Sequence, residues 1–300
     1  MKKAIIFDLD GTLLDTLEDL VLSTNAALSR YGYPERTLEE VRRFVGNGAE
    51  RLMRQAVPGG EGDPHLGDCL QAFREDYQVR MNDHTRPYEG ILKLLGKFSK
   101  EGVPMAIVSN KPDFAVRELS QRFFGDVIRV AIGESEGIRR KPWPDTVKTA
   151  AGKLGVELSD CIYAGDSEVD LKTAKNCGIP CVSVTWGFRE REYLLSLGAE
   201  YMADSPKELY ECYCLLRQCR TPGAGRYSFQ TPLALREGTQ RCEGCKRRTL
   251  RTGASQWIMQ EHLSARAGAG IIYRLFHCQT PGNGVRCICW CCAVHSAIFM

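Results

Sequence analysis

Polar side chains that could perform phosphate chemistry follow directly after three short apolar runs of this 300-residue chain. The runs are Ala4–Phe7, Pro104–Val108 and Cys161–Ala164, and the residues that follow them are Asp8 and Asp10, Ser109 and Asn110, and Asp166. Crowded carboxylates repel one another and raise one another's pKa unless a cation lies among them. Carboxylate oxygens are hard ligands that suit Mg²⁺, an ion that keeps several waters and binds substrate phosphate. The pattern therefore predicts a Mg²⁺ site formed by Asp8, Asp10 and Asp166.

Groups that could bind phosphate oxygens accompany these carboxylates. Thr12 and Ser109 offer hydroxyls, Asn110 follows Ser109, and backbone N–H groups at the strand ends can also meet phosphate. The stretch "RRKPWPD" contains two prolines that stiffen a loop presenting Lys141. Gly11 supplies the sharp turn that lets Asp10 fold back towards the strand end. Lys141 would neutralise charge on the nucleophile and on the phosphoryl group.

The elements that must position these residues alternate between strand and helix. A fourth apolar run of the same kind lies at Pro180–Val184, and weaker ones lie at Val127–Ile132 and Glu200–Met202. Helical patterns separate the runs, at Asp113–Phe124, Asp145–Leu154 and Leu171–Cys177. This alternation predicts an α/β fold with a parallel sheet. Ligands of such sheets bind beyond the carboxyl ends of the strands, where the polar residues lie.

The same residues resemble the four signature motifs of the haloacid dehalogenase-like hydrolases. The first motif, D-x-D-G-T, matches Asp8 to Thr12, and the second, a Ser or Thr that ends an apolar strand, matches Ser109. The third is a lysine, matched by Lys141, and the fourth, G-D-x-x-x-D, matches Gly165 to Asp170. The four motifs occur in the family's order, and the resemblance covers about Met1 to Leu216.

This resemblance implies a Rossmann-like core and a phosphatase mechanism. Asp8 would attack phosphorus to form an aspartyl-phosphate, and Asp10 would act as general acid and then as general base. Mg²⁺ would be bound by Asp8, by the backbone carbonyl of Asp10 and by Asp166. Thr12, Ser109, Asn110 and Lys141 would hold the phosphoryl oxygens, while Asp170 would act through water or orient Lys141.

A helical insertion separates the first motif from the second. Helical patterns occupy Leu17–Tyr31, Thr37–Val45, Ala49–Val57 and His65–Met81, and a crossover helix follows at Gly90–Lys100. The resemblance implies that this insertion is the family's cap domain, which closes over the site and selects the substrate. We therefore expect a catalytic core at 1–15 and 86–216, and a cap at 16–85.

The cap sequence "FVGNGAERLM", Phe44 to Met53, resembles the phosphoglycolate phosphatase branch of the family. Phosphoglycolate is accordingly the favoured substrate, with pyrophosphate, or a range of sugar and nucleotide monophosphates, as the alternatives. Arg42, Arg43, Arg51 and Arg54 could pair with a substrate carboxylate or could be solvated helix charges.

Several of these residues also have purely structural interpretations. The spacing Asp15 to Glu18 predicts a capping box that starts the first helix. Asp170 could be a helix N-terminal acid that complements the helix dipole. Lys141 could be a solvated loop lysine, and Ser109 an ordinary polar strand end.

Charge and cysteine content change abruptly after Leu216. Residues 1–216 carry 28 basic and 34 acidic side chains, whereas residues 217–300 carry 12 basic and 3 acidic ones and eight of the 14 cysteines. The tail's potential metal ligands are Cys242, Cys245, Cys287, Cys289, Cys291, Cys292 and His295, but their spacing is not that of a standard zinc site. Strand and helix periodicity are poor there. We expect a disordered or non-native tail, with zinc or nucleic-acid binding as the alternative.

Composition also limits the location and the partners. No run approaches the ~18 apolar residues of a membrane span, and Asp8 and Asp10 interrupt the apolar start before it could form a signal peptide. The sequence thus predicts a cytoplasmic protein with a small phosphorylated substrate, no membrane association and no specific nucleic acid. A monomer or a homodimer is expected.

Overall fold

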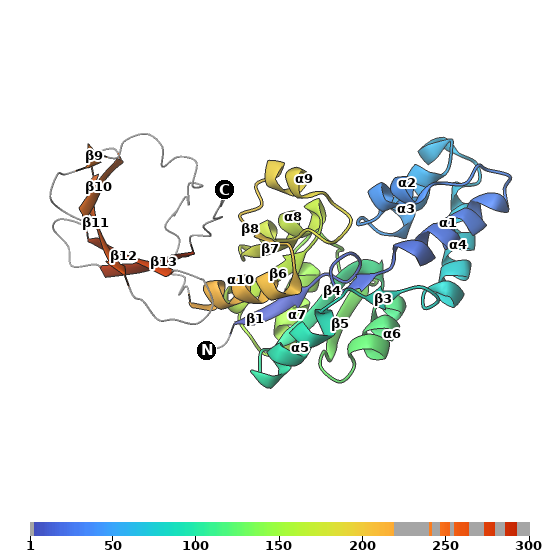
Figure 1. The fold of residues 1–300 in the computed structure, drawn as a ribbon. Coiled ribbons are helices and arrows are strands. Elements are labelled where there is room, and N and C mark those ends of the chain that lie inside the picture. The colour runs from blue at the N-terminus through green and yellow to red at the C-terminus, as the bar shows by residue number, and fades with distance from the viewer. Residues whose placement is uncertain are drawn as a thin grey trace, which may run out of the picture. The chain divides into compact units, whose positions relative to one another are not determined.

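The computed structural model describes residues 3–218 and, beyond them, the backbone of five strands at 240–241, 247–252, 255–263, 273–279 and 286–292. The chain divides into two compact units, Met1–Pro222 and Gly223–Met300 (Figure 1). All the predicted catalytic motifs belong to the first unit.

A six-stranded parallel sheet forms the centre of the first unit. Its strands, in spatial order, are β5 (Val130–Glu134), β4 (Met105–Pro112), β1 (Ala4–Phe7), β6 (Cys161–Gly165), β7 (Cys181–Val184) and β8 (Tyr201–Ala203). All neighbouring pairs are parallel. Numbered along the sheet, this is the Rossmann order 3-2-1-4-5-6, which changes direction between β1 and β6. The predicted Rossmann-like fold class is therefore confirmed.

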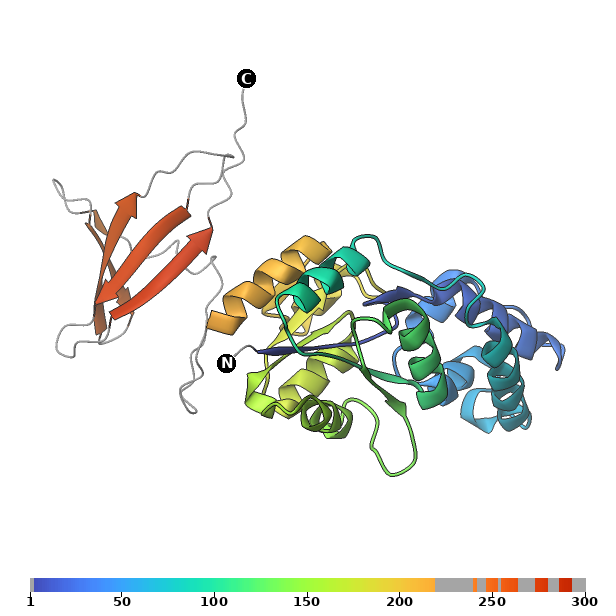
Figure 2. The same cartoon turned by 90° about the horizontal axis from the view of Figure 1, so that it is seen from below.

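Helices cover both faces of this sheet (Figure 2). On one face, Ile5 and Phe7 pack with residues of α5 (Ile91–Lys100), α6 (Asp113–Phe124) and α10 (Pro206–Gln218). On the other face, Ala4 and Ile6 pack with residues of α7 (Asp145–Leu154) and α8 (Glu168–Cys177). A short helix, α9 (Arg191–Ser196), precedes β8. Because successive strand residues point to opposite faces, β1 is buried on both sides and its carboxyl end is fixed.

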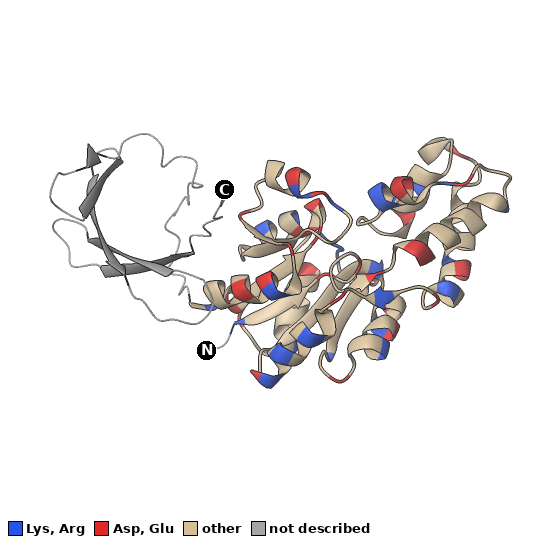
Figure 3. Cartoon of the chain, viewed as in Figure 1, with Lys and Arg blue, Asp and Glu red and all other residues tan. Residues whose placement is uncertain are grey.

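Four helices between β2 and β3 build a second hydrophobic core. They are α1 (Leu17–Ser29), α2 (Leu38–Phe44), α3 (Ala49–Ala56) and α4 (Leu66–Arg80), with a 3₁₀ turn, η1, at Gly60–Gly62. β2 (Leu14–Asp15) pairs antiparallel with β3 (Arg86–Pro87), so both crossings into this helical segment run side by side. Basic and acidic side chains are interspersed along the helices (Figure 3).

The predicted capping box at Asp15 is wrong. Thr16 is the N-cap of α1 and makes no side-chain capping hydrogen bond, while Asp15 lies in β2 opposite Arg86. The two side chains form an ion pair of 3.6 Å. Asp15 therefore pairs with β3 instead of forming a capping box. A capping box does occur at the start of α2, between Thr37 and Glu40.

Arg189 fastens the helical segment to the core. Its guanidinium donates to the carbonyls of Arg42 (3.0 Å) and Val45 (2.8 Å) at the C-terminal end of α2. Glu168 of the core holds the same guanidinium at 2.8 Å. Arg42 in turn donates to the carbonyl of Gly187 at 2.9 Å. Because the last carbonyls of a helix lack intrahelical partners, these bonds satisfy α2 and fix it against the loop after β7.

The second unit contains an antiparallel sheet. Its strands follow the order β13 (Arg286–Cys292), β12 (Tyr273–Gln279), β11 (Ser255–Leu263), β10 (Arg247–Thr252) and β9 (Gln240–Arg241). Cys242, Cys245 and His295 lie outside the described residues. The expectation of a disordered or non-native tail stays a prediction. In the part of the chain that is described, no helix is long and apolar enough to cross a membrane.

A chain that ends at Gln218 should fold as stably as the full-length chain. Leu209, Tyr213 and Leu216 of α10 are buried in the core of the first unit, and α10 ends at Gln218. In thermal unfolding, the shortened chain should therefore have the same Tm as the first unit has within the full-length chain. A matched chain that ends at Glu208 loses three buried side chains, each worth about 2–5 kcal/mol, and should not fold. Equal loss of the transition in both shortened chains would contradict this boundary.

Substitution Arg189→Met should loosen α2 from the core. The Arg189 side chain is only 12% exposed, so its removal leaves carbonyls of α2 and the carboxylate of Glu168 without their donor. Amide hydrogen exchange in α2 should rise at least about tenfold, in line with the ~1.5–3 kcal/mol of charge-assisted hydrogen bonds.

Arg191→Met provides the matched control, because Arg191 forms an exposed pair with Asp204 and such pairs contribute little. Equal rates of amide hydrogen exchange in α2 of the two variants would show that Arg189 does not fasten α2 to the core.

Candidate active site

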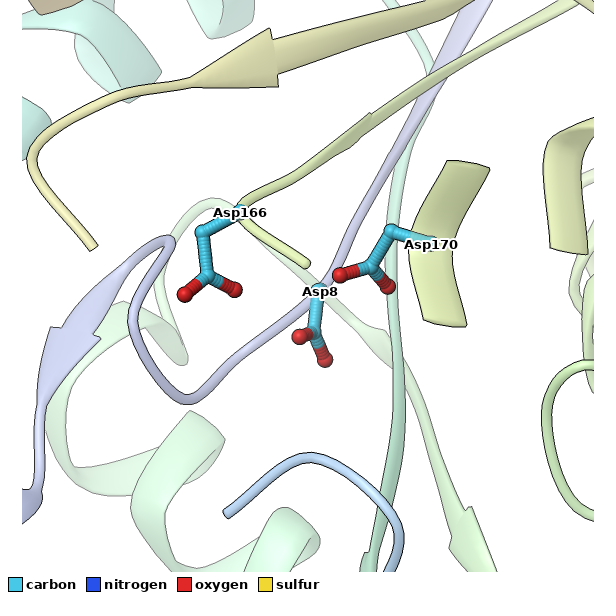
Figure 4. A group of neighbouring side chains, drawn as sticks. All are labelled: Asp8, Asp166 and Asp170. Atoms are coloured by element: carbon cyan, nitrogen blue, oxygen red, sulfur yellow. The ribbon is translucent and has the colours of Figure 1, made fainter. Parts of the chain in front are cut away.

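Three buried carboxylates meet at the point where the strand order changes direction. Asp8 follows β1, Asp166 follows β6, and Asp170 lies in the first turn of α8. One oxygen from each of the three lies within 4.8 Å of the others. Figure 4 shows the side chains of Asp8, Asp166 and Asp170 near one another, each from a different segment of the chain. Since β1 and β6 pair with Phe7 opposite Ala164, the register of the sheet itself brings Asp8 and Asp166 together.

Lys141 links two of these carboxylates. Its Nζ lies 2.8 Å from Oδ1 of Asp8 and 2.8 Å from Oδ1 of Asp170. The hydroxyl of Tyr163, on β6, lies 3.1 Å from the same Nζ and donates to Asp170 at 3.0 Å. The Lys141 side chain is 2% exposed, so the interpretation as a solvated loop lysine is wrong. Lys141 is fixed between the two carboxylates.

Asp170 uses both of its oxygens for hydrogen bonds. Oδ1 accepts from Lys141 and Tyr163, while Oδ2 accepts from the backbone N–H (3.1 Å) and hydroxyl (2.6 Å) of Ser167. The sequence offered two interpretations of Asp170, a helix N-terminal acid and a group that orients Lys141. In the structure Asp170 lies in the first turn of α8 and also contacts Lys141, so the two interpretations are compatible. Its saturated carboxylate is poorly suited to be a metal ligand as well.

The electrostatics of the cluster favour a divalent cation. Burial, and then the charge of Asp170, raise the pKa of Asp8 well above its usual range, although Lys141 opposes the shift. Burial and Asp170 likewise raise the pKa of Asp166 to about 7. Burial would lower the pKa of Lys141, but Asp170 and Asp8 outweigh it and the pKa lies above the usual value. The cluster therefore has more negative charge than Lys141 compensates, and the oxygens of Asp8 and Asp166 are hard donors that fit a divalent metal.

Two glycines leave room for the carboxylate of Asp166. A Cβ atom at Gly11 or at Gly187 would collide with the Asp166 side chain. Gly11 also has a φ of 81°, a left-handed conformation that other residues rarely adopt. The backbone N–H of Phe188 donates to Oδ2 of Asp166 at 2.7 Å, and the Thr12 hydroxyl lies 3.5 Å from Oδ1. The turn at Gly11 and the loop after β7 together fix this carboxylate.

Asp10 lies beside the cluster and has its own cation. Oδ1 of Asp10 lies 2.8 Å from Nζ of Lys111 and accepts from the Thr16 hydroxyl at 2.8 Å. Lys111 comes from the end of β4 and Thr16 from the start of α1. Asp10 is thus held by Lys111 at the end of β4 and by Thr16 at the start of α1.

The second motif adds polar groups from the end of β4. This strand extends to Pro112, so Ser109 and Asn110 lie within it rather than after it. Ser109 is buried and its Oγ accepts from the backbone N–H of Lys111. The amide of Asn110 donates to the carbonyls of Gly46 (3.2 Å) and Lys141 (3.0 Å). Asn110 therefore joins the core to the Gly46 loop, and both of its donated bonds go to backbone.

A cavity of about 60 Å³ lies between this cluster and the helical segment. At ~10–15 Å³ per water, it has room for about four to six waters. Its polar lining includes Asp8, Asp10, Ser109, Asn110, Lys111, Lys141 and Asp166, and its apolar lining includes Leu20, Val45, Leu52, Phe73, Tyr77, Phe114 and Phe188. The helical segment thus closes the catalytic face over a small space.

Some predicted residues lie away from this cavity. Thr12 is not part of its lining and instead lies behind Asp166. The lining of the cavity also lacks the four cap arginines singled out in the sequence, Arg42, Arg43, Arg51 and Arg54. Arg42 contacts the loop after β7, and Arg54 pairs with Glu50 and Glu61.

No role was predicted from the sequence for two residues of the site, Lys111 and Tyr163. Lys111 stands next to two residues that were singled out, and its position at the end of a buried strand was a usable signal. Tyr163 lies within an apolar run and shows its polar role only through its contacts with Lys141 and Asp170.

Comparisons with known proteins agree with this arrangement. Residues 5–184 match the family model of the haloacid dehalogenase-like hydrolases. The chain is 32% identical over 231 residues to a phosphoglycolate phosphatase of Pseudomonas putida, covering 75% of this chain and 82% of that one. It is 30% identical over 211 residues to an N-acetylmuramic acid 6-phosphate phosphatase of Pseudomonas aeruginosa, covering 70% and 93%.

Among solved structures, a protein from Lactobacillus delbrueckii subsp. bulgaricus is similar, with a TM-score of 0.67, 34% identity and coverage of 71% of this chain and 99% of that one. The matched range contains all four motifs, from Asp8 to Asp170. The fold, the cluster of strand-end carboxylates and these matches lead to one conclusion: the chain belongs to the haloacid dehalogenase-like hydrolases.

Proposed function

We propose that this hydrolase is a Mg²⁺-dependent phosphatase that cleaves a small phosphate monoester, with 2-phosphoglycolate favoured, through an aspartyl-phosphate on Asp8. The observation that carries the proposal is the buried pair of Asp8 and Lys141, 2.8 Å apart, at the wall of a small cavity. A carboxylate held beside an ammonium in such a place is suited to attack a phosphoryl group.

In the first half-reaction, an oxygen of Asp8 forms a bond to phosphorus while the bond from phosphorus to the ester oxygen breaks. Asp10 gives a proton to the departing oxygen, which leaves as an alcohol. Lys141 and Ser109 stabilise the negative charge on the phosphoryl oxygens. Asp170 and Tyr163 keep Lys141 in place through their hydrogen bonds.

In the second half-reaction, a water oxygen attacks the phosphorus of the aspartyl-phosphate. Asp10, now ionised, removes a proton from that water, and the bond between phosphorus and Asp8 breaks. Inorganic phosphate leaves and the carboxylate of Asp8 is restored. The ammonium of Lys111 and the hydroxyl of Thr16, both 2.8 Å from Asp10, hold this acid and base in position.

Asp8, Asp166 and the backbone carbonyl of Asp10 are the groups we propose to hold Mg²⁺. When bound, the ion supplies positive charge to the carboxylates and to the phosphoryl oxygens. Asp170 contributes through Lys141 rather than as a ligand, because both of its oxygens already accept hydrogen bonds.

The substrate is proposed from the position of the cavity and from the relatives. The position of the cavity between the catalytic cluster and the helical segment that covers it favours a small ester over a nucleotide or a sugar phosphate. The Pseudomonas putida relative is named for phosphoglycolate, whereas an equally distant relative is named for a phosphorylated amino sugar. Fold alone does not identify a substrate, so pyrophosphate and broader monophosphatase activity are alternatives for the assay to decide.

We assign catalysis to the core at 1–15 and 86–216 and substrate selection to the cap at 16–85. The backbone around Gly46 supports the cap assignment, since its carbonyl accepts from Asn110 at the catalytic face. Gly46 and Gly48 have φ values of 119° and 85°, so this loop adopts a backbone conformation that suits glycine.

Phosphate release should require Mg²⁺ and should be fastest with 2-phosphoglycolate. The assay compares 2-phosphoglycolate, pyrophosphate, a sugar phosphate and a nucleoside monophosphate, each with Mg²⁺, with excess chelator and with Ca²⁺. Chelator should abolish activity, and Ca²⁺ should inhibit it, because calcium prefers more ligands at longer distances. Asp8→Asn should reduce every rate at least about a thousandfold.

Asp15→Asn is the matched control, since Asp15 lies in β2, away from the carboxylate cluster, and pairs with the exposed Arg86 of β3. Full activity in chelator would contradict the metal site. Preference for another member of the panel would overturn the substrate while leaving the phosphatase proposal intact.

A further inference from the structure

Lys111 places a buried ammonium in the wall of the cavity. It lies near the end of β4, directly after Ser109 and Asn110. Its side chain is 4% exposed, although the cavity reaches it. Burying an ammonium is costly unless anionic or polar groups surround it, so its partners indicate what the position is for.

The partners of Lys111 come from both sides of the cavity. Nζ lies 2.8 Å from Oδ1 of Asp10 and 4.6 Å from the centre of the Tyr77 ring. Tyr77 belongs to α4 of the cap and is itself buried, at 3% exposure. The ammonium therefore lies between the proposed general acid and the cap wall.

Other cations around the cavity are already engaged or lie at its edge. Lys141 binds Asp8 and Asp170, and Arg189 binds Glu168 and the carbonyls of α2. Arg74 is exposed, at the edge of the cap. Lys111 has one carboxylate partner, Asp10, and the same oxygen of Asp10 also accepts from Thr16. A second anion could therefore share the three N–H groups of Lys111 without leaving Asp10 unbonded.

We propose that Lys111 binds a carboxylate of the substrate, and that the enzyme selects phosphate monoesters whose alcohol carries a carboxylate on the carbon next to the ester oxygen. This inference rests on the proposed function, because it uses the role of Asp10. To receive a proton, the ester oxygen must lie about 2.6–3.2 Å from Asp10. Lys111 is 2.8 Å from the same carboxylate, so a group one carbon beyond the ester oxygen is within its reach.

Charge complementarity supports this selection. A carboxylate at that position gains a charge-assisted hydrogen bond in a cavity closed by Tyr77 and other apolar residues. A neutral methyl group there gains nothing from the ammonium. Arg42, Arg43, Arg51 and Arg54, which the sequence suggested for this role, are not part of the cavity lining, whereas Lys111 is.

Ligand binding to the Asp8→Asn protein tests the proposal without turnover. Titration calorimetry in Mg²⁺ gives the Kd of 2-phosphoglycolate and of ethyl phosphate, which shares the phosphate but lacks the carboxylate. Adding Lys111→Met, a neutral side chain of similar length, should reduce the preference for 2-phosphoglycolate about 10- to 100-fold. Lys111→Arg, which keeps the charge, should retain most of it.

Equal weakening of both ligands by Lys111→Met would overturn the proposal, because it would mean that Lys111 only positions Asp10. If Lys111→Met does not fold, the wild-type enzyme gives the answer through kcat/KM for 2-phosphoglycolate against its neutral amide. The absence of at least a tenfold preference for the acid would again contradict a role for Lys111. Failure of the wild type to release phosphate from any ester would instead refute the proposed function.

Discussion

The buried ion pair between Asp8 and Lys141 is the interaction on which the rest of the site depends. An aspartate enclosed at a strand end, with Asp166 and Asp170 beside it, would lose its charge without nearby cations. Lys141 supplies one positive charge at 2.8 Å, and the remaining excess of carboxylate favours a divalent metal. The same crowding that makes the site costly in isolation favours the binding of a cation.

The sheet and the cap meet this electrostatic requirement in different ways. Parallel pairing of β1 with β6 fixes Asp8 beside Asp166, and the turn at Gly11 keeps the space that Asp166 needs. The helical segment lies over the cavity, and Arg189 ties α2 to the loop whose backbone N–H binds Asp166. Asp166, the loop after β7 and α2 are therefore neighbours in one network, although they are far apart in the sequence.

Sequence predicted the parts of this arrangement that depend on strand ends. Asp8, Ser109 and Asp166 follow buried apolar runs, and the register of a parallel sheet brings such residues to one edge without further information. The failures involve contacts between distant segments. Asp15 pairs with Arg86 of β3 and forms no capping box. The Thr12 hydroxyl lies 3.5 Å from Asp166 and outside the cavity lining, so its predicted contact with phosphate stays a prediction. The strand-end position of Lys111 was visible in the sequence, but its partners Asp10 and Tyr77 lie on other elements. The contacts of Tyr163 with Lys141 and Asp170 are not revealed by spacing along the chain.

The most direct test of the account is to trap the covalent intermediate on Asp8. Enzyme quenched in acid during turnover of labelled substrate should retain label, and borohydride reduction should convert one aspartate to homoserine, identified by peptide mass spectrometry. We predict that homoserine occurs at position 8 alone and disappears in the Asp8→Asn variant. Reduction at Asp10 or Asp166, or continued turnover by Asp8→Asn without any trapped label, would contradict nucleophilic catalysis by Asp8.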